Sequence, residues 1–223
     1  MNRRRLAQDL TAILLVCCAV TVTGLSVKRE LFPPVEVREP LEMRPVPVEN
    51  GARIAAAGHP LGPPEPDLEL VVFSDFECPA CRTFALEVIP FIREYTGAKI
   101  GVRFRHWPLS RHRLAYPAAR AAECAGDQGR FEAYHNLLFS HQDSIGLKPF
   151  SAFASESGVP DIEEFERCNS QPGPVPRIEA DAKEAQRIGA RGTPSIILEN
   201  LLLQSPLDSA MFMGLLEKAL REG

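Results

Sequence analysis

Cys78 and Cys81 end the stretch FSDFECPAC, with two residues between them. A pair at this spacing can form a reversible disulfide, supply half of a zinc site or serve as an inert structural disulfide. Zinc would need two further ligands, and the remaining cysteines beyond the N-terminal segment, Cys124 and Cys168, are far apart in the chain. We therefore predict no metal and favour redox chemistry, with the inert disulfide as the alternative.

The elements around this pair indicate how it is positioned. Residues 68–73 (LELVVF) are a short apolar run of strand length, and residues 99–104 (KIGVRF) alternate as a second strand. Apolar residues between 84 and 92 recur at helical spacing, although Pro90 should kink that helix. Strand, cysteine loop, helix and strand form a βαβ pattern, which predicts that the two strands pair in parallel.

The start of this helix would activate Cys78. Unpaired backbone N–H groups and the positive end of the helix dipole stabilise a thiolate, and such sites lower a cysteine pKa to roughly 3.5 to 7.5. Pro79 suits the first helical turn because it has no N–H to lose there. Cys81, one turn later, could close the disulfide or resolve a mixed one.

The rest of the domain is predicted to be helical before it returns to strands. Residues 195–198 and 201–204 form a hairpin through Glu199 and Asn200, which are not a favoured turn pair, so its register stays open. An apolar helix over residues 207–220 ends the chain. The region of about 111–189 is an all-helical insertion, with helices predicted at 118–125, 131–138, 150–155, 162–168 and 178–188.

Three features in order resemble the DsbA-like branch of the thioredoxin superfamily. They are the stretch FSDFECPAC, the Gly-Thr-Pro sequence that ends at Pro194 before a strand, and the helical insertion, in which residues 121–139 (AAECAGDQGRFEAYHNLLF) resemble the bacterial proteins. The resemblance covers about residues 68–220. It implies an α/β thioredoxin-like fold, βαβ…ββα, with an all-helical subdomain between the second and third strands.

The resemblance also implies roles for individual residues. Cys78 matches the exposed nucleophilic cysteine, and Cys81 matches the shielded resolving one. Pro194 matches the cis-proline of the family, and Thr193 would offer backbone groups to an extended substrate segment. Without the family context, the Gly-Thr-Pro sequence could be an ordinary loop before a strand.

Three neighbours should tune the pair. Pro79 and Ala80 separate the cysteines, and related oxidases often have His where this chain has Ala80, so a donor to the thiolate is missing. Glu77 would oppose thiolate formation if its carboxylate pointed inward, although an exposed charge is mostly screened. His106, after the second strand, could line the site or be a structural residue.

Cys124 and Cys168 fall in two helices of the insertion. We predict that they form a structural disulfide, which for a loop of about 45 residues stabilises by about 4 kcal/mol in the chain-entropy model. The alternative is two separate buried thiols that behave as small hydrophobic side chains.

The N-terminal region suggests an extracytoplasmic location. Basic residues precede an uncharged run of about 18 residues, so residues 1–27 are predicted to be a membrane anchor or signal segment. Residues 28–67 are rich in proline and are predicted to be a linker, whose part at 52–61 could also pack on the domain. The domain itself would then occupy residues 68–223, in the periplasm or at the outer face of the cytoplasmic membrane, where disulfides persist.

Together these features predict an extracytoplasmic protein disulfide oxidoreductase that needs no cofactor. A net charge of −4 argues against a nucleic-acid partner. Its substrates would be secreted or envelope proteins with cysteines, and its electron partner a membrane protein of the DsbB or vitamin-K-epoxide-reductase type. The alternatives are a reductase or isomerase of the same fold, or a non-catalytic chaperone-like binding module.

Overall fold

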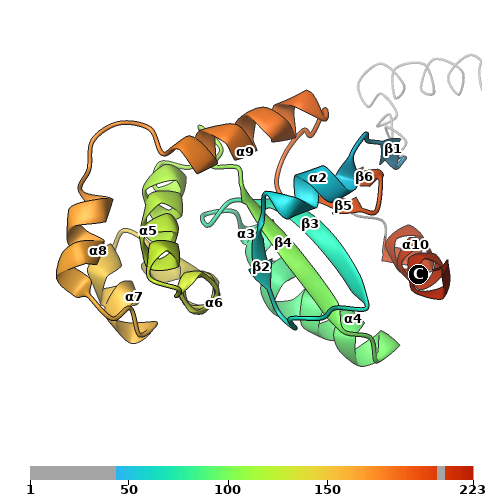
Figure 1. The fold of residues 1–223 in the computed structure, drawn as a ribbon, viewed down its shortest axis with the longest axis horizontal. Helices are drawn as coiled ribbons and strands as arrows, with labels where there is room; N and C mark the ends of the chain where they lie inside the picture. The colour runs from blue at the N-terminus through green and yellow to red at the C-terminus, as the bar shows by residue number, and fades with distance from the viewer. Residues whose placement is uncertain (1–43, 205–208, 223) are drawn as a thin grey trace, which may run out of the picture. The chain divides into compact units, whose positions relative to one another are not determined.

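The computed structural model describes residues 44–204 and 209–222 (Figure 1). The predicted anchor, residues 1–27, and the first part of the predicted linker lie outside the described residues. Within the described ranges, no helix combines the length and the apolar character needed to cross a membrane.

The described chain contains a mixed sheet of six strands in the order β1-β6-β5-β3-β4-β2. At its centre, β3 (Leu68–Ser74) pairs in parallel with β4 (Ile100–His106), which confirms the parallel pairing predicted from the βαβ pattern. On its other side, β3 pairs antiparallel with β5 (Ser195–Leu198), and β5 pairs with β6 (Leu201–Gln204).

Side chains of β3 alternate between the two faces of the sheet, and each face carries helices. Leu70 and Val72 belong to a core shared with a long bent helix, made of α3 (Pro79–Thr83), η1 (Phe84–Val88) and α4 (Ile89–Thr96), and with α10 (Ser209–Glu222). Val71 and Phe73 belong to a second core, formed with α2 (Gly51–Ala56) and residues at the end of α9 (Pro176–Arg187). The sheet is therefore buried on both faces, as parallel pairing requires.

The insertion between β4 and β5 is helical, as predicted. Figure 1 shows its first four α-helices gathered on one side of the sheet, with α9 running back towards the strands. Small alanines on α5 are buried and let its neighbours approach closely. The insertion consists of α5 (Ala115–Asp127), α6 (Phe131–Ser140), the short 3-10 helix η2 (Gln142–Ser144), α7 (Phe150–Glu156), α8 (Ile162–Asn169) and α9.

The second half of the predicted linker belongs to the folded domain, because the sheet begins before residue 68. The predicted boundary at residue 67 is therefore wrong. Strand β1 (Val46–Pro47) pairs with β6, and β2 (His59–Leu61) pairs with β4. Both lie at the edges of the sheet, where a proline does not break a hydrogen-bond ladder on both sides. Prolines that exclude a central strand therefore do not exclude these two edge strands.

The predicted kink at Pro90 takes the form of a change in helix type. Pro90 lies in the first turn of α4, and the preceding turn, η1, is a π-helix. Proline cannot donate a hydrogen bond to the carbonyl four residues before it, so the regular α-helical ladder cannot continue through this point.

The register of the β5-β6 hairpin is set by contacts from outside it. Leu198 pairs with Leu201, and Glu199 has a positive φ of 55° in the turn. The backbone N–H of Gly51 donates to Oδ1 of Asn200 at 3.1 Å. A Cβ at Gly51 would lie 2.0 Å from the carbonyl oxygen of Glu199, so this close approach requires glycine.

Candidate functional site

Cys78 is the N-cap residue of α3, directly after the turn that follows β3. Its backbone N–H donates to the carbonyl of Asp75 at 3.1 Å, and its own carbonyl accepts from the N–H of Cys81 at 3.1 Å. Pro79 occupies the first turn, as predicted. The local sequence thus places Cys78 where helix N–H groups are unpaired and Cys81 one turn further on.

The two thiols have opposite proton affinities, and both are reduced in this structure. Hydrogen bonds from the Cys81 thiol and from the backbone N–H groups of Cys81 and Ala80 lower the pKa of Cys78 to about 5. They do so although Cys78 is buried, at 4% exposed, and not exposed as the resemblance implied. Burial, together with the hydrogen bond and negative charge of Cys78, raises the pKa of Cys81. Cys78 is therefore a thiolate near neutral pH, and Cys81 is its hydrogen-bond donor.

Thr193 and Pro194 lie beside Cys78, joined by a cis peptide bond. The Sγ atom of Cys78 lies 3.3 Å from the carbonyl oxygen of Thr193, a residue 115 positions away in sequence. Both Thr193 and Pro194 are buried. The structure thus brings together the four residues predicted to bind substrate and exchange disulfides.

The predicted tuning residues act in different ways. The carboxylate of Glu77 accepts a hydrogen bond from the backbone N–H of Leu114 in the segment before α5. It is therefore tied to that segment and does not act on the Cys78 thiolate. The methyl group of Ala80 is exposed, whereas its backbone N–H contributes to the low pKa of Cys78. The helix backbone supplies part of what a side-chain donor would supply at that position.

Two buried polar contacts that support the site were not predicted. The carboxylate of Asp75 accepts hydrogen bonds from the backbone N–H groups of Glu77 and Leu109, each at 2.8 Å, and its Oδ2 lies 2.8 Å from Nδ1 of His112. Gln142 donates from its amide nitrogen to the carbonyl of Cys78 at 3.1 Å. Asp75 stood inside the motif itself, but no sequence signal pointed to Gln142.

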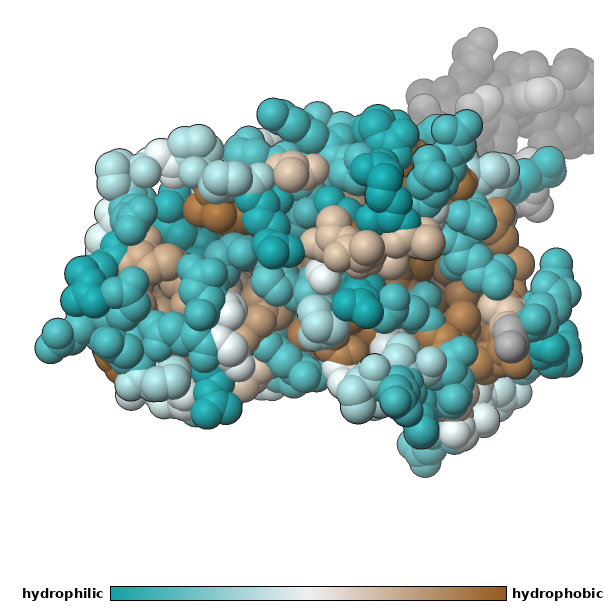
Figure 2. Space-filling model, viewed as in Figure 1, coloured by the Kyte–Doolittle hydropathy of each residue, from teal (hydrophilic) through white to brown (hydrophobic). Residues whose placement is uncertain are grey.

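An apolar groove of about 460 Å³ adjoins the cysteine pair. It passes from Ala80 and Pro194 between the bent helix and α10. On the face of the molecule drawn in Figure 2, most of the surface is hydrophilic, and hydrophobic surface is gathered beside α10. The side chains that make the groove apolar are Phe84, Val88, Phe91, Ile92, Phe212 and Met213.

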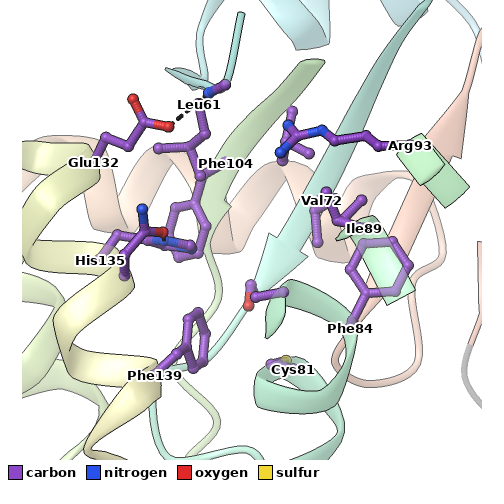
Figure 3. Close-up of a pocket in the computed structure, with 15 residues that line it drawn as sticks. Leu61, Val72, Cys81, Phe84, Ile89, Arg93, Phe104, Glu132, His135 and Phe139 are labelled. Carbon is purple, nitrogen blue, oxygen red and sulfur yellow. Dashed lines mark hydrogen bonds between the residues drawn. The ribbon is translucent and has the colours of Figure 1, made fainter. Parts of the chain in front are cut away.

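Cys81 lines a second, smaller cavity of about 80 Å³, which lies between the bent helix, the sheet and α6. Figure 3 shows Cys81 at one end of this cavity, with Phe139 and His135 on the α6 side and Glu132 and Arg93 further away. The two cysteines therefore have different surroundings, because Cys78 lies against Thr193 and Cys81 lines this interior cavity.

Cys124 and Cys168 are joined by a disulfide between α5 and α8, with their Cα atoms 5.8 Å apart. This disulfide lies in the helical insertion, on elements other than those that hold Cys78 and Cys81. The structure therefore places the two cysteine pairs in separate parts of the fold, one as a disulfide and one as free thiols.

His106 is a buried structural residue of the insertion interface. Its Nε2 lies 2.8 Å from Oε1 of Glu123, and Nε2 of His59 lies 2.6 Å from the same oxygen. Burial favours the neutral carboxyl, but hydrogen bonds from His106 and His59 lower the pKa of Glu123 to about 2. The three ligand atoms lie within 4.8 Å of one another, so this group could hold a metal ion, yet hydrogen bonds alone satisfy it.

A family model described as Thioredoxin matches residues 55–218. The Na(+)/H(+) antiporter NhaA 1 of Mycolicibacterium gilvum (strain PYR-GCK) is 34% identical over 163 residues, which are 71% of this chain and 26% of the antiporter. The chain thus spans about a quarter of the length of that relative.

Two solved structures share the fold. A thioredoxin-like oxidoreductase from Silicibacter pomeroyi DSS-3 is 27% identical with a TM-score of 0.60, over 78% of this chain and 99% of that one. The α-DsbA1 protein of Wolbachia pipientis is 20% identical with a TM-score of 0.59, over 79% and 94% of the two chains.

Proposed function

The chain belongs to the thioredoxin family, with the fold of its DsbA-like thiol-disulfide oxidoreductases, and from this premise we propose that it oxidises cysteine pairs in extracytoplasmic proteins. The observation that carries the proposal is the environment of Cys78, whose pKa is lowered to about 5 at the start of α3. A stabilised thiolate favours the reduced form of the pair, which makes its disulfide more oxidising.

The reaction exchanges one disulfide for another. A substrate thiolate attacks Sγ of Cys78 in the Cys78–Cys81 disulfide, and Cys81 leaves as a thiolate that takes up a proton. A second substrate thiolate then attacks the substrate sulfur of the mixed disulfide, and Cys78 leaves as a stabilised thiolate. The substrate gains a disulfide, and the enzyme pair gains two electrons.

The groove beside Cys78 supports a protein substrate that is unfolded or extended. Its aromatic and aliphatic walls suit apolar side chains, which a folded substrate would keep buried. Pro194, at one end of this groove, lies on the segment that leads into β5. A substrate cysteine with apolar neighbours could therefore reach Cys78 while its flanking residues occupy the groove.

Two features support the proposed compartment. The uncharged N-terminal run after three arginines favours export or anchoring, and the Cys124–Cys168 disulfide suits an oxidising environment. After each turnover the reduced pair must lose two electrons, so we expect a membrane partner of the DsbB or vitamin-K-epoxide-reductase type that receives them.

A redox titration of the purified chain in glutathione buffers tests the direction of the reaction. An oxidase should have a potential of roughly −120 to −200 mV, and a value well below about −260 mV would favour a reductase instead. Two results together would favour the chaperone-like alternative. The wild-type chain would oxidise no dithiol, and the Cys78→Ser variant would still bind peptide.

A further inference from the structure

The buried resolving cysteine, Cys81, must exchange a proton with solvent during each reaction cycle. Cys81 is 1% exposed, and burial raises the pKa of its thiol. Whenever Cys81 attacks a mixed disulfide it must lose a proton, and whenever it leaves as a thiolate it must regain one. A proton that moves on every turnover needs a polar path from this buried sulfur to solvent.

The cavity behind Cys81 provides such a path. Its volume of about 80 Å³ has room for about two water molecules. It reaches from the buried Cys81 and Ser74 to Glu132 and Asn136, which are exposed on α6. Figure 3 shows Cys81 and Glu132 at opposite ends of the cavity. The Ser74 hydroxyl hydrogen-bonds to Cys81 and favours its thiolate. Water in this cavity would have polar partners at both ends.

His135 supplies a hydrogen-bond acceptor between those ends. Its Nδ1 lies 2.9 Å from Oδ1 of Asn136, and in the tautomer with the proton on Nδ1 this contact is a hydrogen bond and Nε2 is the acceptor. Within the part of the chain that the structure describes, Nε2 makes no hydrogen bond to another protein atom. It is also not one of the fully buried polar atoms without a partner, so part of its surface is accessible to water. Burial lowers the pKa of His135 to about 4, so the ring is neutral at neutral pH.

Building on the proposed function, we propose that Cys81 exchanges its proton with solvent through this cavity, along water that His135 positions between Ser74 and Glu132. In the resolving direction the Cys81 proton passes to this water, and a proton leaves at the mouth. The Cys81 thiolate then bonds to Sγ of Cys78, and the substrate thiolate departs. His135 is a positioning residue in this scheme, because it acts on the water and does not touch the reacting sulfur atoms.

The charges around the cavity are compatible with this path. At its mouth, Glu132 accepts a hydrogen bond from the backbone N–H of Gly62 at 2.7 Å, and Arg93 donates to the carbonyl of Ile100. Two imidazoles whose charge would act on His135, those of His59 and His106, share the Glu123 carboxylate. On the sulfur side the charged neighbour of Cys81 is the Cys78 thiolate, which disappears when Cys78 enters a mixed disulfide.

Ellman's reagent separates the two cysteines in one measurement. This reagent is a disulfide of two thionitrobenzoate groups. The reduced Cys78 thiolate attacks it, forms a mixed disulfide and releases one thionitrobenzoate. Cys81 then attacks Sγ of Cys78 in the mixed disulfide and releases the second thionitrobenzoate. The full chain would carry Cys17→Ser and Cys18→Ser so that only the two site thiols react. Stopped-flow mixing across a pH series gives a first phase for Cys78 and a second phase for Cys81.

We expect His135→Phe to slow the second phase by about tenfold or more near neutral pH and to leave the first phase unchanged. The difference between the second-phase rates of the variant and the wild-type chain should become smaller as pH rises, because hydroxide then takes the proton. A merely structural change would slow the second phase equally at every pH. The same substitution at the exposed His141, which lies outside the cavity, is the matched control and should alter neither phase.

Ala85→Leu offers a second test that keeps His135 and narrows the cavity from the bent helix. It should also slow the second phase alone, and it decides the matter if His135→Phe does not fold. A second phase of unchanged rate and pH profile in the folded variants, or equal slowing of both phases, would overturn the proposal. A wild-type chain that releases no second thionitrobenzoate would instead count against the proposed function.

Discussion

Two cysteine pairs occupy different parts of this fold and have different surroundings. Cys78 and Cys81 lie at the start of a helix, where the thiolate of Cys78 has donors around it. Cys124 and Cys168 are 44 residues apart on two helices, and the Asp127 carboxylate lies 4.0 Å from Sγ of Cys168. A negative neighbour opposes a thiolate. The difference teaches that the stability of the reduced form, more than the disulfide itself, separates an exchangeable pair from a structural one.

Removing the exchangeable pair should have the largest effect. Cys78→Ser should abolish disulfide exchange, because Cys81 is buried and its thiol holds its proton. Oxidation of a reduced cysteine-containing peptide, followed by mass spectrometry, measures the loss. The matched control is the double variant Cys124→Ala and Cys168→Ala, which should retain exchange where it is folded; loss of exchange in that control would break the comparison.

The structural pair should matter for stability instead. The same Cys124→Ala and Cys168→Ala variant should lower the free energy of unfolding by about 4 kcal/mol, because the loop of 44 residues is no longer closed in the unfolded chain. Urea denaturation of the oxidised proteins measures this. A loss below about 1 kcal/mol would show that this disulfide constrains the chain far less than its loop length implies.

The pH dependence of Cys78 sharpens the comparison further. Its folded pKa of about 5 is below the unfolded value of about 8.5, so this group stabilises the reduced fold above pH 8.5 and the contribution is lost as pH falls through 5. Cys81 adds nothing below about pH 8, since it is protonated in both states. Iodoacetamide alkylation of Cys78 should therefore stay fast down to about pH 5 and slow below it. A midpoint near 8.5 would contradict the activated thiolate.

The smallest effect is expected at Glu77, the charged neighbour of Cys78. Because its carboxylate accepts a hydrogen bond from Leu114, Glu77→Gln should shift the pKa of Cys78 by only a few tenths of a unit. The alkylation profile measures this shift, with Ala80→Gly as a control that keeps the backbone donor. A drop of a full unit would mean that the carboxylate acts directly on the thiolate.

Most of the fold could be predicted because its signals are local. The helices of the insertion followed apolar spacing, and the Cys-x-x-Cys pair after a strand indicated both the helix start and the chemistry. The edge strands β1 and β2 were missed because their prolines suggested a linker, and an edge position is a property of the whole sheet. Gln142 and His135 were missed for the same reason, since each is near the site only in the folded chain: Gln142 donates to the carbonyl of Cys78, and His135 lines the same cavity as Cys81.

The sequence by itself determined which atoms can do chemistry here: two thiols three positions apart, at a helix start that lowers the proton affinity of the first. It also determined the βαβ pattern, since side-chain periodicity acts within a few residues. Only the tertiary structure decided what surrounds those thiols. It placed Thr193 and Pro194 against Cys78, and behind Cys81 a cavity that Ser74 and His135 help to line. Such contacts join distant segments through packing and burial, which no local pattern records.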